Sequence, residues 1–500
     1  MGEFILSSSL IQSKIELLAS YIGHSPKELE RLSHKLFGTL GLDSLTLTRV
    51  RGFLEPKPTY QILSGLTIKQ VAERISVTEE NKTFIGPDIL EKDSEFNAFP
   101  LTPMQESYVI GAMQECPCQI YTEIDVSGLE VEFFKQALRA VPANHPMLHA
   151  RIVNNSHQEI RDKSEYYQNM HLEISESTDL DKRREECLMR FKSSSDLYWD
   201  VQLTRLDSNT VRIHIIIDMV FIDAVSAMQI CREVATEYEN ILTNQPSDNL
   251  VTNNLTFQSY CNQLSMKSVS EESLNYWNAR CNEIPDPPQL PRLKNSEIEG
   301  FDFQRECITL DSNYWNTLKK LAQKVEITPN SLVLAAFSEV LRLYSENPDF
   351  SVAVTMSGRP VDKGNDFSGV VGEYTDIILC PITNRPGSKI VDAAVNIHNT
   401  LCESLEYNDV TGLDLIRMLR NYHEDQHLSF PIVFTSFLGV VDPDLTLRDC
   451  EIKLHYQQTQ TPQITLDHQI YEMNGNLQIN WDYDAKVYSK SLINEMLNCF

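Results

Sequence analysis

A strand-like stretch that carries two carboxylates, residues 211–226, limits what this chain can fold into more than any other segment. It begins with an isoleucine-rich run of the kind that packs in a buried strand, and it contains Asp218 and Asp223. An isolated ionised carboxylate is costly to bury, so each aspartate requires a partner or a chemical role. The simpler interpretation is a strand end with one capping and one surface aspartate, and the spacing alone leaves both interpretations open.

Charge and composition exclude several classes of protein. The 43 basic and 70 acidic residues give a net charge of −27, which repels nucleic acid and anionic membranes. The first residues have no basic region typical of a signal peptide, and no run approaches the ~18 apolar residues of a membrane span. Eleven cysteines without paired CxxC spacing indicate neither a disulfide framework nor a metal site. We therefore expect a cytoplasmic protein with no nucleic-acid partner and no membrane span.

The first eighty residues predict a small all-α bundle. Residues 11–22 have apolar side chains at helical spacing, and a further helix is expected over residues 67–75. Ser44 lies where a helix begins, which suits an N-cap serine but also a phosphate group, because free amide donors and the positive helix end face that position. Residues 81–95 are polar and are expected to form a linker.

The local string decides between these two interpretations. Residues 41–45, Gly-Leu-Asp-Ser-Leu, resemble the phosphopantetheine attachment site of acyl and peptidyl carrier proteins. The resemblance implies that residues 1–80 are a peptidyl or aryl carrier and that Ser44 is esterified with 4′-phosphopantetheine. It further implies a phosphopantetheinyl transferase as a partner.

Residues 96–500 alternate between strand-like and helical segments, which favours an α/β sandwich. The proline-rich residues 285–291 form a stiff connector, so we expect two lobes, residues 96–285 and 286–500. The segments on which this rests are strands near residues 120–127, 211–218, 350–356 and 374–380 and helices near residues 105–112, 131–141, 224–242, 312–325, 330–343 and 493–497.

Six segments of this region resemble, in order, the signatures of the condensation superfamily of non-ribosomal peptide synthetases, and within it the heterocyclization domains. The resemblance implies a two-lobed, chloramphenicol-acetyltransferase-like pseudo-dimer. Ala112 and Asn144 stand where that family usually has arginine. The matching segments are residues 99–105, 144–148, 218–223, 372–375, 431–436 and 460–469.

The proton chemistry is expected away from the usual histidine motif. Ordinary condensation domains carry a central histidine where this chain has Met219, and a thioether cannot relay a proton usefully. The resemblance implies that Asp467 takes and returns protons and that Thr435 orients it or the reacting oxygen. His468 is expected on the opposite face of the strand, because side chains alternate along a strand.

Several other residues are expected to shape the site. The resemblance implies that Asp223 is structural and forms a bidentate pair with Arg359, which would tie the two sides together. Asp218 is expected to have a weaker structural role, and Gln463 and Gln469 to line a tunnel.

The resemblance implies an enzyme, an acyltransferase and cyclodehydratase. It would join a carrier-bound acyl thioester to a carrier-bound Cys, Ser or Thr and close the amide to a thiazoline or oxazoline, as in siderophore-type biosynthesis. A downstream aminoacyl carrier and an adenylating enzyme are then expected as partners, and we expect the chain to be part of a larger synthetase. The alternatives are an ordinary condensation domain without ring closure and an inactive module that only docks carriers.

Overall fold

The computed structural model describes most of the chain, and Ser44 and the expected linker 81–95 lie outside the described residues. Within the described part, no helix combines the length and apolar character needed to cross a bilayer. The described residues are 11–12, 14–19, 22, 26–37, 50–54, 56–75, 98–162, 172, 174–177, 179–193, 199–245, 255–294, 300–362, 365–383, 388–439 and 446–500.

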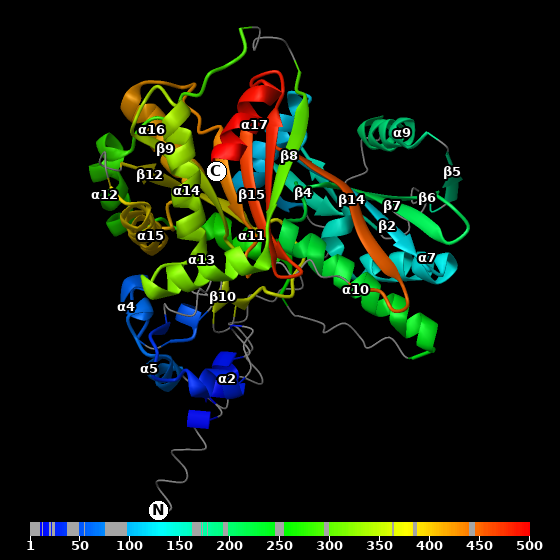
Figure 1. Ribbon diagram of the computed structural model, residues 1–500, viewed down its shortest axis with the longest axis horizontal. Coiled ribbons are helices and arrows are strands. Elements are labelled where there is room, and N and C mark those ends of the chain that lie inside the picture. Colours follow the sequence, from blue (N-terminus) through cyan, green and yellow to red (C-terminus); the bar gives the residue numbers. More distant parts are fainter. Residues whose placement is uncertain are drawn as a thin grey trace, which may run out of the picture.

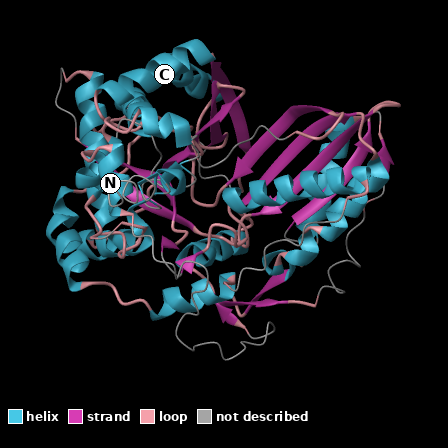
Figure 2. Ribbon diagram, turned by 90° about the horizontal axis from the view of Figure 1, so that it is seen from below, coloured by secondary structure: helices cyan, strands magenta, loops and turns pink. Residues whose placement is uncertain are grey.

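A five-stranded sheet forms the centre of the N-terminal lobe (Figure 2). Helices α7 (Val131–Ala140) and α10 (Ala224–Thr243) pack on one face and α9 (Leu180–Ser193) on the other. The alternation of residues 211–217 explains this arrangement, because Val211 and Ile213 enter one core while Ile216 enters the other. In sheet order the strands are β14 (Glu451–Gln460), β2 (Gln119–Ser127), β7 (Thr210–Asp218), β6 (Trp199–Arg205) and β5 (Ile174–Glu176).

Smaller elements complete this lobe. They are β1 (Phe99–Pro100), β3 (Ala150–Val153), β4 (His157–Ile160), α6 (Pro103–Met113), α11 (Phe257–Met266) and two 3-10 helices, η3 (Pro142–Asn144) and η4 (Pro146–His149). Helix α12 (Glu271–Arg280) and the 3-10 helix η5 (Cys281–Glu283) follow in the sequence but pack against the second lobe. A capping box on Thr102 and Gln105 fixes the start of α6, the helix that the sequence predicted near residues 105–112.

A six-stranded mixed sheet forms the second lobe. Helices α13 (Ser312–Lys324), α14 (Pro329–Tyr344), α15 (Ile390–Glu406) and α17 (Lys490–Cys499) share one core on it. Helix α16 (Gly412–His423) packs on the other face. In sheet order the strands are β12 (Thr375–Ile382), β9 (Phe350–Ser357), β13 (Ile432–Ser436), β15 (Leu466–Met473), β16 (Asn476–Asp484) and β8 (Phe303–Leu310), and a separate hairpin pairs β10 (Val361–Asp362) with β11 (Asn365–Asp366). The expected two-lobed α/β architecture is confirmed.

Strand β14 connects the two lobes. It follows β13 in the sequence, yet it pairs antiparallel with β2 and forms the edge of the N-terminal sheet. Figure 1 shows its orange ribbon beside the strands β2 and β7 of the other lobe. The sequence division into residues 96–285 and 286–500 did not foresee this crossing.

The described part of residues 11–75 is helical and has its own apolar core. Its labelled helices are α2 (Pro26–Arg31), α4 (Tyr60–Ser64) and α5 (Ile68–Arg74), and α5 begins at the capping residue Thr67. Because the described residues leave out Ser44, they do not establish a carrier domain. We call this part the N-terminal module.

The N-terminal module packs against α15 of the second lobe (Figure 1). Cys402 and Leu405 of α15 and Ile378 of β12 join the apolar core of the module. The carboxylate of Glu406 accepts a hydrogen bond from Arg51 Nη2 at 2.7 Å and another from the backbone N–H of Tyr60 at 2.6 Å. The Glu406 carboxylate therefore binds the N-terminal module at two positions.

Replacing Glu406 with alanine is expected to loosen the N-terminal module. The change removes two charge-assisted hydrogen bonds from a partly exposed site, worth about 1–2 kcal/mol for the association of module and lobe. Hydrogen exchange should become faster over residues 50–74. Asn396→Ala, an exposed change on the same helix, is the control, and equal exchange in both variants would show that Glu406 does not hold the module.

Candidate active site

A cavity of about 470 Å³ lies between the two lobes. Its wall includes α6 and the start of α10 from the N-terminal lobe and β9, β12, β13 and α16 from the other. The segment after β14, residues 461–464, also lines it. Gly111 of α6 lies so close to this segment that a Cβ there would be 2.2 Å from Pro462. Close packing of α6 therefore fixes the part of the wall that precedes β15.

Asp467 and Thr435 meet on the cavity side of the second sheet. Strands β13 and β15 are parallel neighbours, with Val433 opposite Asp467 and Thr435 opposite Gln469. All four side chains share one face, because side chains alternate along a strand. The Thr435 hydroxyl donates to Asp467 Oδ1 at 2.8 Å, and Gln469 Nε2 donates to Oδ2 at 2.6 Å. Each carboxylate oxygen of Asp467 thus has its own donor, and all three polar residues line the cavity.

Burial raises the pKa of Asp467 to about 6, against the hydrogen bond from Gln469. The nearby charge of Asp482 also raises the pKa, while the Thr435 hydroxyl and the positive charge of Arg305 lower it. A carboxyl group with this pKa is mostly ionised at pH 7 and is protonated at a small cost. It is therefore suited both to accept a proton and to return it.

His468 points to the opposite face of β15, as the alternation predicted. It is fully buried among Phe337, Phe434 and Trp481, and the Trp481 indole donates to His468 Nδ1 at 2.6 Å. Burial lowers its pKa to about 3, so the ring stays neutral. His468 supports the core and does not face the cavity.

Asp223 and Arg359 join across the lobes, and both are almost fully buried. Arg359 Nη2 lies 3.0 and 3.1 Å from the two carboxylate oxygens, while Nη1 donates to the carbonyls of Phe367 and Val370. One nitrogen spans the carboxylate, so the expected fork-to-fork pairing is not the observed geometry. Asp223 also caps α10 by accepting from the Ser226 N–H at 2.7 Å.

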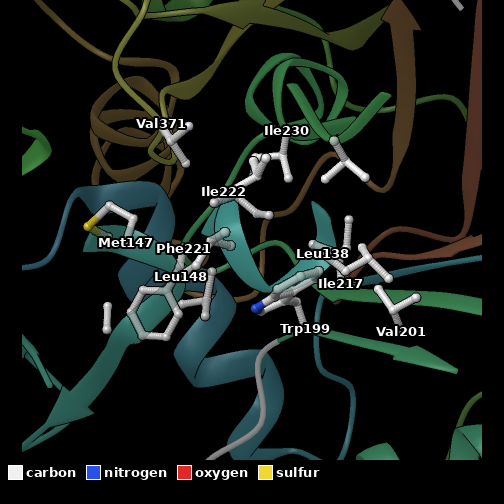
Figure 3. Close-up of a cluster of buried hydrophobic side chains, with 14 of the residues drawn as sticks. Leu138, Met147, Leu148, Trp199, Val201, Ile217, Phe221, Ile222, Ile230 and Val371 are labelled. Atoms are coloured by element: carbon white, nitrogen blue, oxygen red, sulfur yellow. The ribbon is translucent and has the colours of Figure 1, made fainter. Parts of the chain in front are cut away.

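Between the two aspartates, Phe221 and Ile222 anchor the turn in the core of the N-terminal lobe. Figure 3 shows their side chains among those of Leu148, Ile230 and Val371, and all belong to one buried cluster. This packing determines where Asp223 can lie.

Asp218 ends β7 and accepts from the backbone N–H of Val220 at 3.0 Å. Burial raises its pKa to about 7. The adjacent Met219 lines the cavity, so the wall at this point presents a thioether.

Glu373 is a buried carboxyl group whose importance sequence reasoning missed. It accepts from the Thr375 N–H at 2.9 Å, and burial together with the charge of Asp223 raises its pKa to about 8. Burial likewise raises the pKa of the neighbouring Asp376 to about 7. The Gly-Glu-Tyr-Thr motif was the available signal, but burial cannot be read from it.

The other expected residues fall as follows. Gln463 lines the cavity and has a left-handed backbone, with φ of 64°. Ser44 lies outside the described residues. Among the residues that the structure describes, no group of histidine, cysteine, aspartate or glutamate side chains is arranged to hold a metal ion.

A match to the family model described as "Condensation domain" spans residues 96–500. The chain belongs to the condensation-domain family of non-ribosomal peptide synthetases. Domains of this family are acyltransferase-type catalytic domains, and the cavity between the lobes is the candidate active site.

The chain is similar to two curated relatives and to one solved structure. The chain is 26% identical over 457 residues to pyochelin synthetase PchF of Pseudomonas aeruginosa, covering 87% of this chain and 25% of that protein. It is 26% identical over 443 residues to phenyloxazoline synthase MbtB of Mycobacterium sp. (strain MCS), covering 85% of this chain and 37% of that protein. The chain therefore spans well under half the length of either relative.

The solved structure is the EpoB cyclization-docking bidomain of Sorangium cellulosum. Its rhombohedral crystal form is 27% identical, with a TM-score of 0.68, and the match covers 81% of this chain and 83% of that one. The monoclinic form is 25% identical with the same TM-score, and the match covers 94% of this chain and 95% of that one. This share is larger than the share that residues 96–500 make up, so the second match extends into the residues before 96.

Asp223→Ala is expected to lower the free energy of unfolding by about 3–5 kcal/mol, because it leaves the buried Arg359 without its carboxylate. Denaturant unfolding measures this, and Asp223→Asn, which keeps an acceptor for the helix cap, should cost less. Asp311→Ala is the matched control: it removes only an exposed cap of α13, worth about 1 kcal/mol. Unchanged stability with lost activity would instead indicate a chemical role for Asp223.

Proposed function

We propose that this chain contains a heterocyclization domain that forms an amide between two carrier-bound substrates and then closes it to a thiazoline or oxazoline. The observation that carries the proposal is the Asp467 carboxylate, which lines the cavity with Thr435 2.8 Å away. The names of two relatives, a phenyloxazoline synthase and a cyclization-docking bidomain, agree with it. Residues 96–285 and 286–500 are the proposed lobes of this domain.

In the first step the amine of the acceptor substrate attacks the donor thioester carbonyl. The new C–N bond forms, the C–S bond breaks, and the proton from nitrogen goes to the leaving thiolate. With Met219 at the position of the family's histidine, the chain offers no imidazole there. We infer that positioning of the two substrates in the cavity supplies much of the acceleration of this step.

Ring closure is assigned to Asp467. The ionised carboxylate accepts the proton of the substrate thiol or hydroxyl as that group attacks the amide carbonyl, and returns it to the carbonyl oxygen, which becomes the hydroxyl of a ring hemiaminal. The carboxylate then takes the N–H proton and gives it to that hydroxyl, so that the C–O bond breaks, water leaves and the C=N bond forms. Thr435 holds the carboxylate in place through these steps.

The second candidate is an ordinary condensation domain that stops at the amide. Met219 argues against this candidate, because it replaces the central histidine that ordinary condensation domains carry. An inactive module that only docks carriers is less consistent with a cavity-lining carboxyl group whose pKa is near 6.

For residues 1–80 we propose a carrier domain, followed by a linker over residues 81–95, with 4′-phosphopantetheine on Ser44. When attached, that group supplies the thioester that holds the acyl starter. A downstream aminoacyl carrier and an adenylating enzyme would then supply the other substrate. The EpoB match that covers 94% of this chain favours a second candidate, a docking module.

Asp467→Asn is expected to form the amide but to close the ring about 10²–10⁴ times more slowly, because asparagine cannot exchange a proton. Mass spectrometry of the released product measures both, since ring closure removes one further water. In the unchanged protein the ring-closure rate should rise with pH through an apparent pKa near 6, as the Asp467 base becomes ionised.

The control is Asn313→Ala, an exposed change on α13 at a residue that does not line the cavity. It shows whether substitution and purification alone alter the rate of ring closure. Normal ring closure by Asp467→Asn would exclude Asp467 as the proton carrier. An uncyclised product from the unchanged protein would favour the ordinary condensation reaction.

Treatment with coenzyme A and a phosphopantetheinyl transferase is expected to raise the intact mass by one phosphopantetheine group. The Ser44→Ala variant should gain nothing, because it lacks the acceptor hydroxyl, whereas Ser33→Ala is the control and should gain the full group. If neither the unchanged protein nor the control gains mass, the N-terminal module is not a carrier and the docking alternative is favoured.

A further inference from the structure

Arg305 occupies a position that neither the sequence motifs nor the proposed chemistry uses. It lies on β8, and the strand register places Asp467, Asp482 and Arg305 in one row across β15, β16 and β8. Two carboxylates are therefore direct neighbours on the cavity face, and the arginine lies on the far side of the second. Like charges opposite each other on adjacent strands are unfavourable unless a cation is close.

Arg305 pairs with Asp482 at close range. Its Nε lies 2.6 Å from Asp482 Oδ1 and its Nη2 lies 2.6 Å from Oδ2, a bidentate contact. The side chains of Arg305 and Asp482 are 11% and 2% exposed. This pair confines the negative charge of Asp482 and so limits its effect on Asp467.

The same arginine also orients Gln469. Arg305 Nη2 donates to Gln469 Oε1 at 3.1 Å, which leaves the amide nitrogen to donate to Asp467 at 2.6 Å and to Thr459 at 2.6 Å. A guanidinium group can only donate, so it determines which end of the amide faces it. With the amide reversed, an oxygen would face the Asp467 carboxylate.

Arg305 further connects the site to the strand that crosses between the lobes. Its Nη1 donates to Gln457 at 2.9 Å and its Nη2 to Thr459 at 3.2 Å, both on β14. The orientation of Gln469 therefore depends on β14 being paired in the N-terminal sheet.

We propose that Arg305 is a positioning residue for ring closure, which holds Gln469 as a donor to Asp467 and neutralises Asp482 beside it. The proposal rests on the proposed function of Asp467. Arg305 acts through Gln469 and Asp482, and it is not assigned any contact with substrate.

The charged and polar groups that face Asp467 come from four strands. Asp482 and Arg305 lie on β16 and β8, Thr435 on β13, and Thr459 on β14 reaches it through Gln469. Without Arg305 the Asp482 charge faces Asp467 with no cation beside it, so the proton on Asp467 should be held more tightly.

The test compares four variants by single-turnover mass spectrometry between pH 5 and 9. In Arg305→Met combined with Asp482→Asn, which removes both charges and so limits the risk of unfolding, ring closure relative to amide formation should fall about 10- to 100-fold. Gln469→Leu should give a similar loss, and adding it to the double variant should cost little more, because both act through the same contact. Arg305→Lys keeps the positive charge but not the shape of the guanidinium group. Its pH profile of ring closure should therefore be closer to that of the unchanged protein than its rate of ring closure is.

Lys319→Met is the matched control, because it removes a cation that pairs with Glu472 of the same strand β15 but on the opposite face of the sheet. It should leave the ratio of the two rates unchanged. An unaltered ratio in the Arg305→Met, Asp482→Asn variant, or full additivity with Gln469→Leu, would overturn the proposal.

A second measurement separates this inference from the proposed function. Titration of carboxyl-labelled aspartate by NMR, with Asp467→Asn to assign the signal, should place the Asp467 transition at higher pH in Arg305→Met than in the unchanged protein. If the unchanged protein closes no ring, the proposed function fails, and the titration still tests Arg305. An identical Asp467 titration in both proteins would overturn the positioning role.

Discussion

The pairing of β14 with β2 is the interaction on which the site depends. It places a strand from the C-terminal part of the chain at the edge of the N-terminal sheet. Asp467 follows only a few residues later on β15 of the other sheet. The short connection between the two strands lines the cavity and packs against Gly111. Separating the lobes would therefore disturb the wall next to Asp467, because the segment that connects β14 to β15 is short.

A second connection holds the lobes through Asp223 and Arg359. The backbone of Gly372 joins it, since its carbonyl accepts from the Asp223 N–H at 3.0 Å and from the Ser226 hydroxyl at 2.9 Å. A Cβ at Gly372 would lie 2.1 Å from Phe257, so only glycine permits this approach. The ion pair is buried, so its net contribution to stability is small, whereas removing one partner alone is costly. The two connections together place the walls of the cavity, while Asp467 and Thr435 on one sheet supply its chemistry.

Local signals in the sequence predicted much of the fold. Helix-like segments in the sequence located helices such as α6 and α10 to within a few residues, and the motifs pointed to Asp467, Thr435 and the Asp223–Arg359 contact. The crossing of β14 could not be predicted, because an edge strand carries no local record of a partner more than 300 positions away. Arg305 was missed for the same reason: its significance comes from the register of β8 with β16. The raised pKa values of Asp218 and Glu373 follow from burial, which a motif does not encode.

The sheet of the second lobe separates the cavity from the N-terminal module. On β9 and β12, Thr355 and Ile377 line the cavity, whereas Val354 and Ile378 face the cores that include α15 and the module. β12 is the edge strand of this sheet. If the module is a carrier, as proposed, its arm has to pass around the β12 edge to reach Asp467, or the module has to leave α15. The second route would break both the polar contacts of Glu406 and the apolar contacts that Cys402 and Leu405 make with the module. Docking on α15 would then be a resting position, and delivery of the substrate would require the module to move.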